Sequence, residues 1–157
     1  MEARYLDPAV DLNHLSKLED GTIGKEYWRH LKDNNLDPIF YPDIPVENDL
    51  QWLSMRGRQI HDLTHVILGF GTEVSDELGV QAYTLGQITD PSAAMIIGGG
   101  IFNAGFKKPW TIPECFEAII RGYHMGRSSD FIIGVNFSTM WDKPLEEFRA
   151  EIGMPAF

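Results

Sequence analysis

The chain has 157 residues and a formal net charge of −10 at pH 7, with 43% hydrophobic and 23% charged residues. This size and composition predict one globular domain, spanning 1–157, that can bury a core without disulfides. The negative charge argues against nucleic acid as a partner, and it also argues against electrostatic docking on anionic lipid. Cys115 is the only cysteine, which fits a reducing compartment, and its helical surroundings predict a buried, inert thiol.

The N-terminal segment predicts no signal or transit peptide, because it is acidic and has neither an apolar core nor an Arg/Ser-rich leader. The most apolar run, AAMIIGGGIF, has ten residues and is too short for a transmembrane helix. We therefore expect a cytoplasmic protein. Any contact with the inner membrane is expected to be peripheral and hydrophobic.

The first predicted helix begins near Thr22, and its apolar residues recur at fourfold spacing on one side. Residues 36–49 carry three prolines and are expected to form a loop within the domain. The next helix is expected from about Leu50 to Leu68, with Asp49 as its cap and an apolar stripe facing the core.

Four more helices are expected after a break at the glycines of residues 69–71. Ser75 is a candidate cap for the first of them, and a proline opens each of the others. Their expected ranges are 75–87, 91–106, 113–127 and 144–153. Residues 131–137 are the one candidate strand, and one strand makes no sheet. The predicted fold class is all-α, a single-domain helical bundle.

Two histidines on the 50–68 helix suggest a metal site. His61 and His65 are four residues apart, so their imidazoles lie about 40° apart on the interior side of a helix and can bind one divalent ion. Asp62 is a candidate weak ligand or orienting residue. Glu77 is expected to return to the pair from the following helix, which places the site between two helices. Such a ligand set suits zinc, iron or manganese, although a pair of hydrogen-bonded core histidines remains an alternative.

This stretch also resembles a known family. HDxxH followed by eleven residues and a glutamate is the signature of the Coq4 proteins of ubiquinone biosynthesis, and the chain matches it at His61, Asp62, His65 and Glu77. Residues 19–31 and 140–155 are similar to further stretches of the family, so the resemblance covers about 18–155. Longer members carry helical sequence ahead of the first stretch, where this chain has only about twenty residues. We therefore expect that a lipid groove, if present, is covered differently in this chain.

The resemblance implies an all-helical protein that holds one divalent metal, usually described as zinc, at those four residues. It implies a polyprenylated quinone precursor as the lipid partner, with other ubiquinone biosynthesis proteins as further partners. Two activities follow from it: oxidative C1 decarboxylation of the precursor, which replaces a ring carboxylate with a hydroxyl group, or a non-catalytic scaffold for a biosynthetic complex. A homodimer would suit a small lipid-handling bundle.

Two other stretches are candidates for substrate contacts. Residues 93–106 can line a tunnel for an isoprenoid tail, with Ile97 and Ile101 as lining residues, or they can form a core helix with small-residue packing. Arg121 and Arg127 can hold an acidic head group, or they can belong to a solvated helix end.

A third function remains open from the adjacent His–Asp pair alone. Phosphohydrolases of the HD type use such a pair together with a further histidine and aspartate. His30 and Asp130 are the nominal candidates for these two positions.

Overall fold

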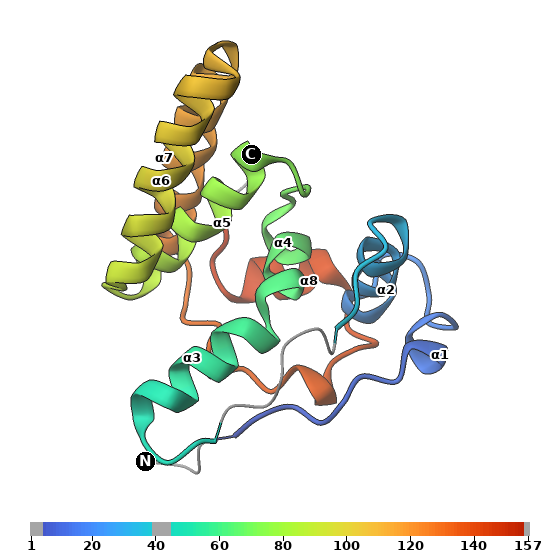
Figure 1. Cartoon of the computed structure of the whole chain (residues 1–157). Coiled ribbons are helices and arrows are strands. Elements are labelled where there is room, and N and C mark those ends of the chain that lie inside the picture. Colours follow the sequence, from blue (N-terminus) through green and yellow to red (C-terminus); the bar gives the residue numbers. More distant parts are fainter. Residues whose placement is uncertain (1–4, 39–44, 156–157) are drawn as a thin grey trace. The chain divides into compact units, whose positions relative to one another are not determined.

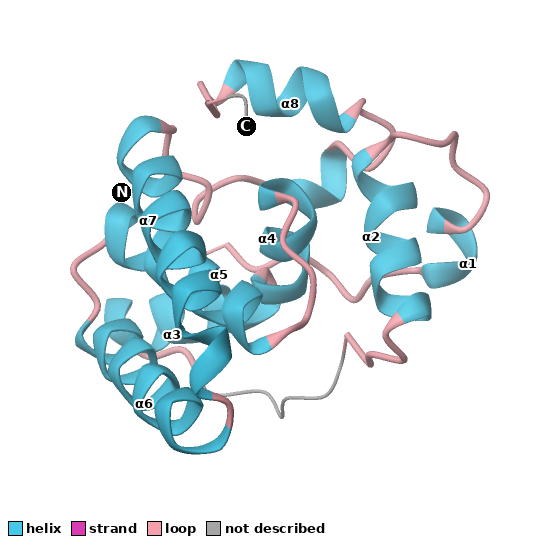
Figure 2. Cartoon of the chain, turned by 90° about the horizontal axis from the view of Figure 1, so that it is seen from above, coloured by secondary structure: helices cyan, strands magenta, loops and turns pink. Residues whose placement is uncertain are grey.

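The computed structural model describes residues 5–38 and 45–155, and this part of the chain is helical. Figure 2 shows helices and loops and no strand among the described residues. The backbone pairing outside the helices includes one isolated bridge, between Thr22 and Pro144. The predicted all-α fold class is therefore confirmed.

Two compact units make up the chain. The first comprises the described parts of Met1–Ile67 and Phe131–Arg149, and the second those of Leu68–Asp130 and Ala150–Phe157. Figure 1 labels the α-helices. The first unit contains α1 (Leu12–Leu15), α2 (Ile23–Asp33), α3 (Asp49–Gln59) and the 3₁₀ helix η2 (Phe137–Thr139). Two helices begin in the first unit and end in the second: α4 (His61–Leu68) and α8 (Leu145–Glu151). The second unit contains α5 (Val74–Gln87), α6 (Pro91–Lys107), the 3₁₀ helix η1 (Pro109–Thr111) and α7 (Ile112–Ser128).

Local capping signals set most helix starts. The Thr22 hydroxyl accepts a hydrogen bond from the Lys25 backbone N–H at 3.3 Å, at the position near which this helix was expected to begin. The Asp90 carboxylate accepts one from the Ser92 backbone N–H at 2.8 Å. Prolines stand at the predicted starts of α6 and α7.

Two predicted caps were wrong by one or two positions. Asn48, and not Asp49, caps α3, because its side chain accepts from the Gln51 N–H at 2.9 Å. Helix α5 begins earlier than predicted, after Glu73, so Ser75 lies buried inside its first turn.

The predicted helix 50–68 is two helices, with a break at Ile60. The Thr64 hydroxyl donates to the Ile60 carbonyl at 2.7 Å, and the Thr64 N–H donates to the same carbonyl at 2.8 Å. A hydroxyl that bonds back to the carbonyl four residues earlier often bends a helix. Ile60 is the C-cap of α3, and α4 is a separate helix whose first residue is His61.

The predicted strand at 131–137 is wrong, because a buried arginine occupies its backbone acceptors. Arg56 of α3 donates from Nε to the Ile133 carbonyl at 3.0 Å and from a terminal nitrogen to the Val135 carbonyl. The segment passes as a loop into η2. A side chain therefore takes the place that a neighbouring strand would have.

Arg56 also fixes the N-terminal segment. Its side chain is 1% exposed and forms an ion pair of 2.6 Å with Asp7, whose side chain is 6% exposed. The other carboxylate oxygen of Asp7 accepts from the Ser138 N–H at 3.0 Å. The Arg56 guanidinium also lies over the Phe137 ring, 5.8 Å from its centroid. One buried cation thus joins α3, the N-terminal segment and η2.

The second unit depends on a close approach of the α5 and α7 backbones. A Cβ atom on Gly122 would fall on the Gly79 carbonyl oxygen, and one on Gly126 would fall on that of Tyr83. A Cβ on Gly86 would lie 2.8 Å from the Tyr123 carbonyl oxygen. Glycines at these positions allow the two helices to pack backbone against backbone.

The small residues of α6 play a smaller part than predicted. A Cβ atom on Gly98 or Gly99 would have no atom outside its own helix within 4 Å, so these two glycines face open space. Gly100 does pack against the Leu78 side chain, and Ala104 is buried in a cluster with Leu78 and Cys115. The buried thiol was predicted.

Substitution of Gly122 tests this packing. We expect Gly122→Ala to lower the free energy of unfolding by at least about 2 kcal/mol, because the methyl group has to push the two backbones apart. Gly99→Ala is the matched control, and it should leave stability unchanged or raise it by up to about 1 kcal/mol. Urea unfolding measures both, and equal stability of Gly122→Ala and the wild type would contradict the close approach.

The Arg56–Asp7 pair gives a second stability prediction. Arg56→Met should lower the free energy of unfolding by about 3 kcal/mol or more, because it leaves a buried carboxylate without its cation. The double variant Asp7→Leu with Arg56→Met should recover part of this loss. Arg58→Met, on the exposed side of the same helix, should change stability by no more than about 0.5 kcal/mol.

Candidate metal centre

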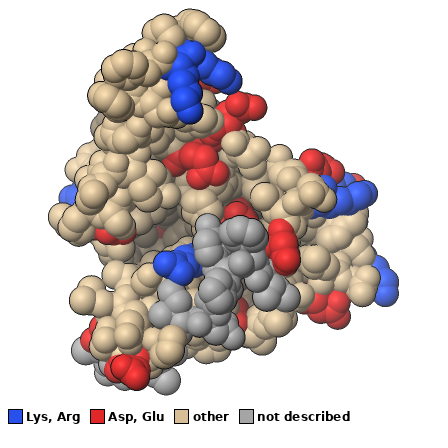
Figure 3. Space-filling model, in the orientation of Figure 1, with Lys and Arg blue, Asp and Glu red and all other residues tan. Residues whose placement is uncertain are grey.

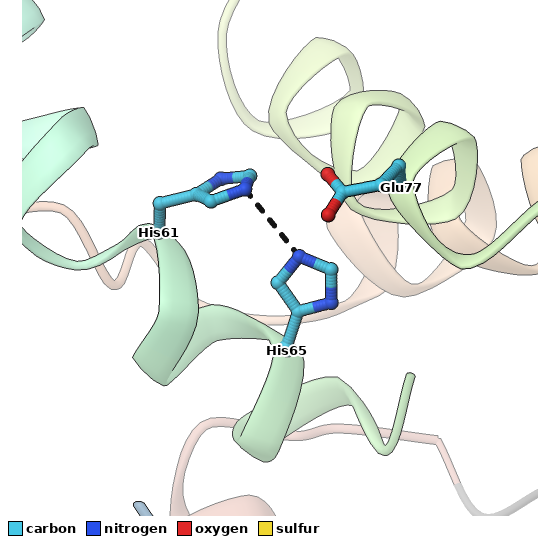
Figure 4. A group of neighbouring side chains, drawn as sticks. All are labelled: His61, His65 and Glu77. Atoms are coloured by element: carbon cyan, nitrogen blue, oxygen red, sulfur yellow. Dashed lines mark hydrogen bonds between the residues drawn. The ribbon is translucent and has the colours of Figure 1, made fainter. Parts of the chain in front are cut away.

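His61 and His65 lie one turn apart on α4 and turn their rings toward each other (Figure 4). Their Nε2 atoms are 3.4 Å apart, and the ring planes meet at 83° with centroids 4.9 Å apart. His65 is 1% exposed, whereas His61 is half-buried. The structure therefore confirms that the two imidazoles share one face of the helix.

The separation of the two nitrogen atoms fits a shared metal ion. Two imidazole nitrogens bound to one tetrahedral zinc ion, each at about 2.05 Å, lie about 3.3 Å apart. The observed 3.4 Å matches this value. To bind the ion, both rings must carry their proton on Nδ1, so that both Nε2 lone pairs are available.

Glu77, from the N-terminal half of α5, completes a group of three. One ligand atom from each of His61, His65 and Glu77 lies within 4.8 Å of the others, and Figure 4 shows the carboxylate directed at the imidazoles. Two neutral imidazoles and one carboxylate form a donor set that suits zinc, iron or manganese. Three protein ligands also leave a coordination position for water or substrate.

Asp62 is not part of this group. Its negative charge acts on Tyr27 of α2: burial, and to a lesser extent the nearby Asp62 carboxylate, raise the pKa of the Tyr27 hydroxyl above its usual range. Tyr27 is 3% exposed and stacks on Trp141, with ring centroids 5.8 Å apart. Whether Asp62 ligates or orients the metal stays a prediction.

His30 was considered only for a phosphohydrolase site, yet its ring lies against His65. The two rings are stacked, with centroids 5.6 Å apart and planes 23° from parallel. Tyr27 and His30 are three residues apart on α2, so they lie on one side of the helix. This spacing was the available signal, but only the tertiary structure shows that this side faces α4. The ligand group found among the described residues consists of His61, His65 and Glu77, and it includes neither of the nominal phosphohydrolase candidates, His30 and Asp130.

Arg121 contacts the turn that precedes α5. Its guanidinium donates to the Leu68 carbonyl at 2.9 Å and approaches the Gly69 carbonyl at 3.4 Å, at the C-terminal end of α4. It also lies 4.4 Å from the centroid of the Phe70 ring. Gly69 has a φ of +66°, which favours glycine in this turn. Arg127 is exposed near the end of α7, and the head-group role of both arginines stays a prediction.

The predicted tunnel residues lie on a helix that is partly core and partly surface. Ile97 and Ile101 are half-buried, and Ile101 packs against the cluster of Leu78, Ala104 and Cys115. Large apolar side chains on the other sides of α6 and α7, and in η1 between them, are exposed. We call them the apolar face: Met95, Ile96, Phe102, Phe106, Trp110, Phe116, Ile120 and Tyr123.

The α6 part of the apolar face carries little charge. Helix α6 has no acidic residue, and its one basic residue is the last, Lys107. The surface over α6 is mostly uncharged in the view of Figure 3. Exposed apolar areas of this size mark contacts with proteins, lipids or membranes. Among the described residues, none of the helices combines the length and hydropathy that a bilayer crossing requires.

Known proteins resemble the chain along nearly its whole length. Residues 4–156 match the family model described as coenzyme Q (ubiquinone) biosynthesis protein Coq4. The mitochondrial ubiquinone biosynthesis protein COQ4 homolog of Nematostella vectensis is 29% identical over 163 residues, which cover 98% of this chain and 76% of that protein. The homolog of Rattus norvegicus is 27% identical over 148 residues, covering 92% and 55%. The chain thus spans about half to three quarters of the length of these relatives.

A solved structure shows the same fold. The crystal structure of a candidate ubiquinone biosynthesis protein from Nostoc punctiforme has a TM-score of 0.89 and 32% sequence identity, and the match covers 98% of this chain and 72% of that one. The family model spans both compact units. The chain therefore belongs to the Coq4 family of ubiquinone biosynthesis proteins.

Proposed function

We propose that the chain binds one divalent metal ion through His61, His65 and Glu77 and catalyses oxidative C1 decarboxylation of a polyprenylated hydroxybenzoate precursor of ubiquinone. The observation that carries this proposal is the 3.4 Å separation of the two Nε2 atoms beside the Glu77 carboxylate. A histidine pair that served only to fill a core would not need a third ligand atom at this position.

The ligand residues determine what such a site accepts. Two neutral imidazoles and one carboxylate carry one negative charge, so a bound divalent ion keeps a net positive charge that attracts a ring carboxylate or a phenolate. When bound, the ion supplies Lewis acidity and an open position, and a redox-active ion also supplies electrons for oxygen chemistry. Burial of His65 keeps water from one side of the ligand set. The reaction breaks the bond between the ring carbon and its carboxylate, releases CO₂ and forms a carbon–oxygen bond in its place. With water as the source of the hydroxyl oxygen, two electrons and two protons pass to O₂, which becomes H₂O₂.

The apolar face is the proposed contact for the isoprenoid tail, or for the bilayer from which the substrate is drawn. A long apolar tail stays in a membrane, so an enzyme that acts on its head group has to reach the lipid surface. Ile97 and Ile101 are the proposed tunnel residues beside this face, and Arg121 and Arg127 the proposed head-group contacts. Other ubiquinone biosynthesis proteins and a second copy of the chain are further proposed partners.

A second candidate is a non-catalytic scaffold that binds prenyl lipid. The apolar face favours it, because that face lies on α6 and α7 and uses none of the ligand residues. The two functions differ in their need for the metal: a scaffold tolerates loss of a ligand as long as the chain folds, whereas the enzyme does not.

Removal of one ligand separates enzyme from scaffold. We expect the purified wild type to hold about one metal ion per chain, and His65→Ala to weaken metal binding at least 100-fold and to abolish rescue of ubiquinone synthesis in a strain lacking its own Coq4 protein. His124→Ala, at an exposed histidine of α7, is the control and should retain both. Metal analysis and quinone extraction are the measurements. If folded His65→Ala still rescues, the enzyme proposal is wrong and the scaffold stands.

Binding to vesicles tests the apolar face. The double variant Phe102→Ser with Phe106→Ser should lower partitioning onto phosphatidylcholine vesicles at least tenfold, because each exposed phenylalanine contributes about 1.5 kcal/mol or more when it leaves water. Leu50→Ser removes an apolar side chain that is 79% exposed on α3, outside this face, and should leave partitioning unchanged. Equal partitioning of all three proteins in a sedimentation assay would contradict a lipid contact here.

A further inference from the structure

We propose that His30 is a positioning residue of the metal centre, which holds the plane of the His65 imidazole so that its Nε2 atom points at the ion. The proposal rests on the metal site of the proposed function. It starts from one observation, the stacking of the two rings at 5.6 Å with planes 23° from parallel.

The imidazole of a ligand histidine needs such support. Rotation about its terminal side-chain torsion is soft, so an unsupported ring can turn out of the plane in which Nε2 points at the ion. In this structure the His65 ring meets the edge-on ring of His61 and the parallel face of His30. Two contacts at different angles restrict the rotation. A flat neighbour on one face sets the plane in which the Nε2 lone pair points.

His30 is itself held in place. Helix α2 is tied to the segment before α8 by backbone hydrogen bonds, from Ile23 to Lys143 at 2.9 Å and from Gly24 to Trp141 at 2.8 Å. One helical turn before His30, Tyr27 is buried against Trp141. The Nε2 atom of His30 is also fully buried. Because α2 is held in place, the His30 ring has a fixed position and can restrict the orientation of the His65 ring.

The action proposed for His30 is through its shape. Phenylalanine keeps a flat ring at the same place, whereas leucine keeps the bulk without a plane, and alanine removes both. Residues that orient a metal ligand typically change metal affinity by 10- to 100-fold when they are lost. We therefore expect His30→Ala and His30→Leu to raise the Kd for zinc roughly tenfold or more. His30→Phe should stay within about threefold of the wild type.

The experiment measures zinc binding to the full chain by competition with a chromophoric chelator, with thermal unfolding to confirm that each variant folds. His14→Ala, at an exposed histidine of α1, is the control and should leave the Kd unchanged. A second readout needs no metal: NMR spectra of the imidazole nitrogens should show the His65 resonances shifted in His30→Ala and His30→Leu, because the stacked ring is gone.

The outcomes separate two failures. If the wild type binds no zinc, the metal centre of the proposed function is wrong, and the role of His30 falls with it. If the wild type binds zinc and folded His30→Leu binds it equally well, only the role of His30 is wrong. A loss of affinity in His30→Phe as large as in His30→Ala would also overturn the proposal, since a flat ring would then not be sufficient.

Discussion

The first compact unit depends on one buried guanidinium. Arg56 is the largest fully buried side chain in the described part of the protein, and its ion pair with Asp7 lies where water cannot screen it. Because it also bonds the carbonyls of Ile133 and Val135, three segments far apart in sequence meet at one cation. The break at Ile60 and the start of the histidine helix follow within a turn or so of this residue. The start of the helix that carries His61 and His65 therefore lies just over a turn after the residue that holds these segments together.

Prediction from the sequence succeeded where the determining interactions are local. Thr22 and Asp90 cap helices through bonds to neighbours two or three residues away, and the opening prolines suit a first turn because their φ is fixed and they lack an N–H. The 61–65 histidine spacing needs only the period of a helix. It failed where a distant partner decides. Residues 131–137 have the pattern of a strand, but Arg56 holds their carbonyls, and the polar surroundings of His30 do not show that α2 lies against α4. Glycines 122 and 126 give a readable small-residue signal, but not the identity of their partner helix.

The two histidines differ in their exposure, which bears on the proposed catalytic role. His65 is covered on the α2 side by His30, while His61 and Glu77 are half-buried. If these residues bind an ion, as proposed, one covered and two partly accessible ligands would leave a side from which substrate could approach.

The contact between Gly79 and Gly122 has a consequence for the register of α5 against α7. A shift of α7 by one residue would bring Arg121 or Tyr123 to a place that has no room for even a methyl group. The contact between these two glycines therefore allows only one alignment of α5 and α7. Glu77 lies two residues before Gly79, and Arg121 lies one residue before Gly122. The same alignment of α5 and α7 therefore fixes the position of the Glu77 carboxylate along α5 and brings the Arg121 guanidinium to the Leu68–Gly69 turn. Gly79 and Gly122, which have no side chains, thus fix the position of Glu77 along α5 together with that of the turn before this helix.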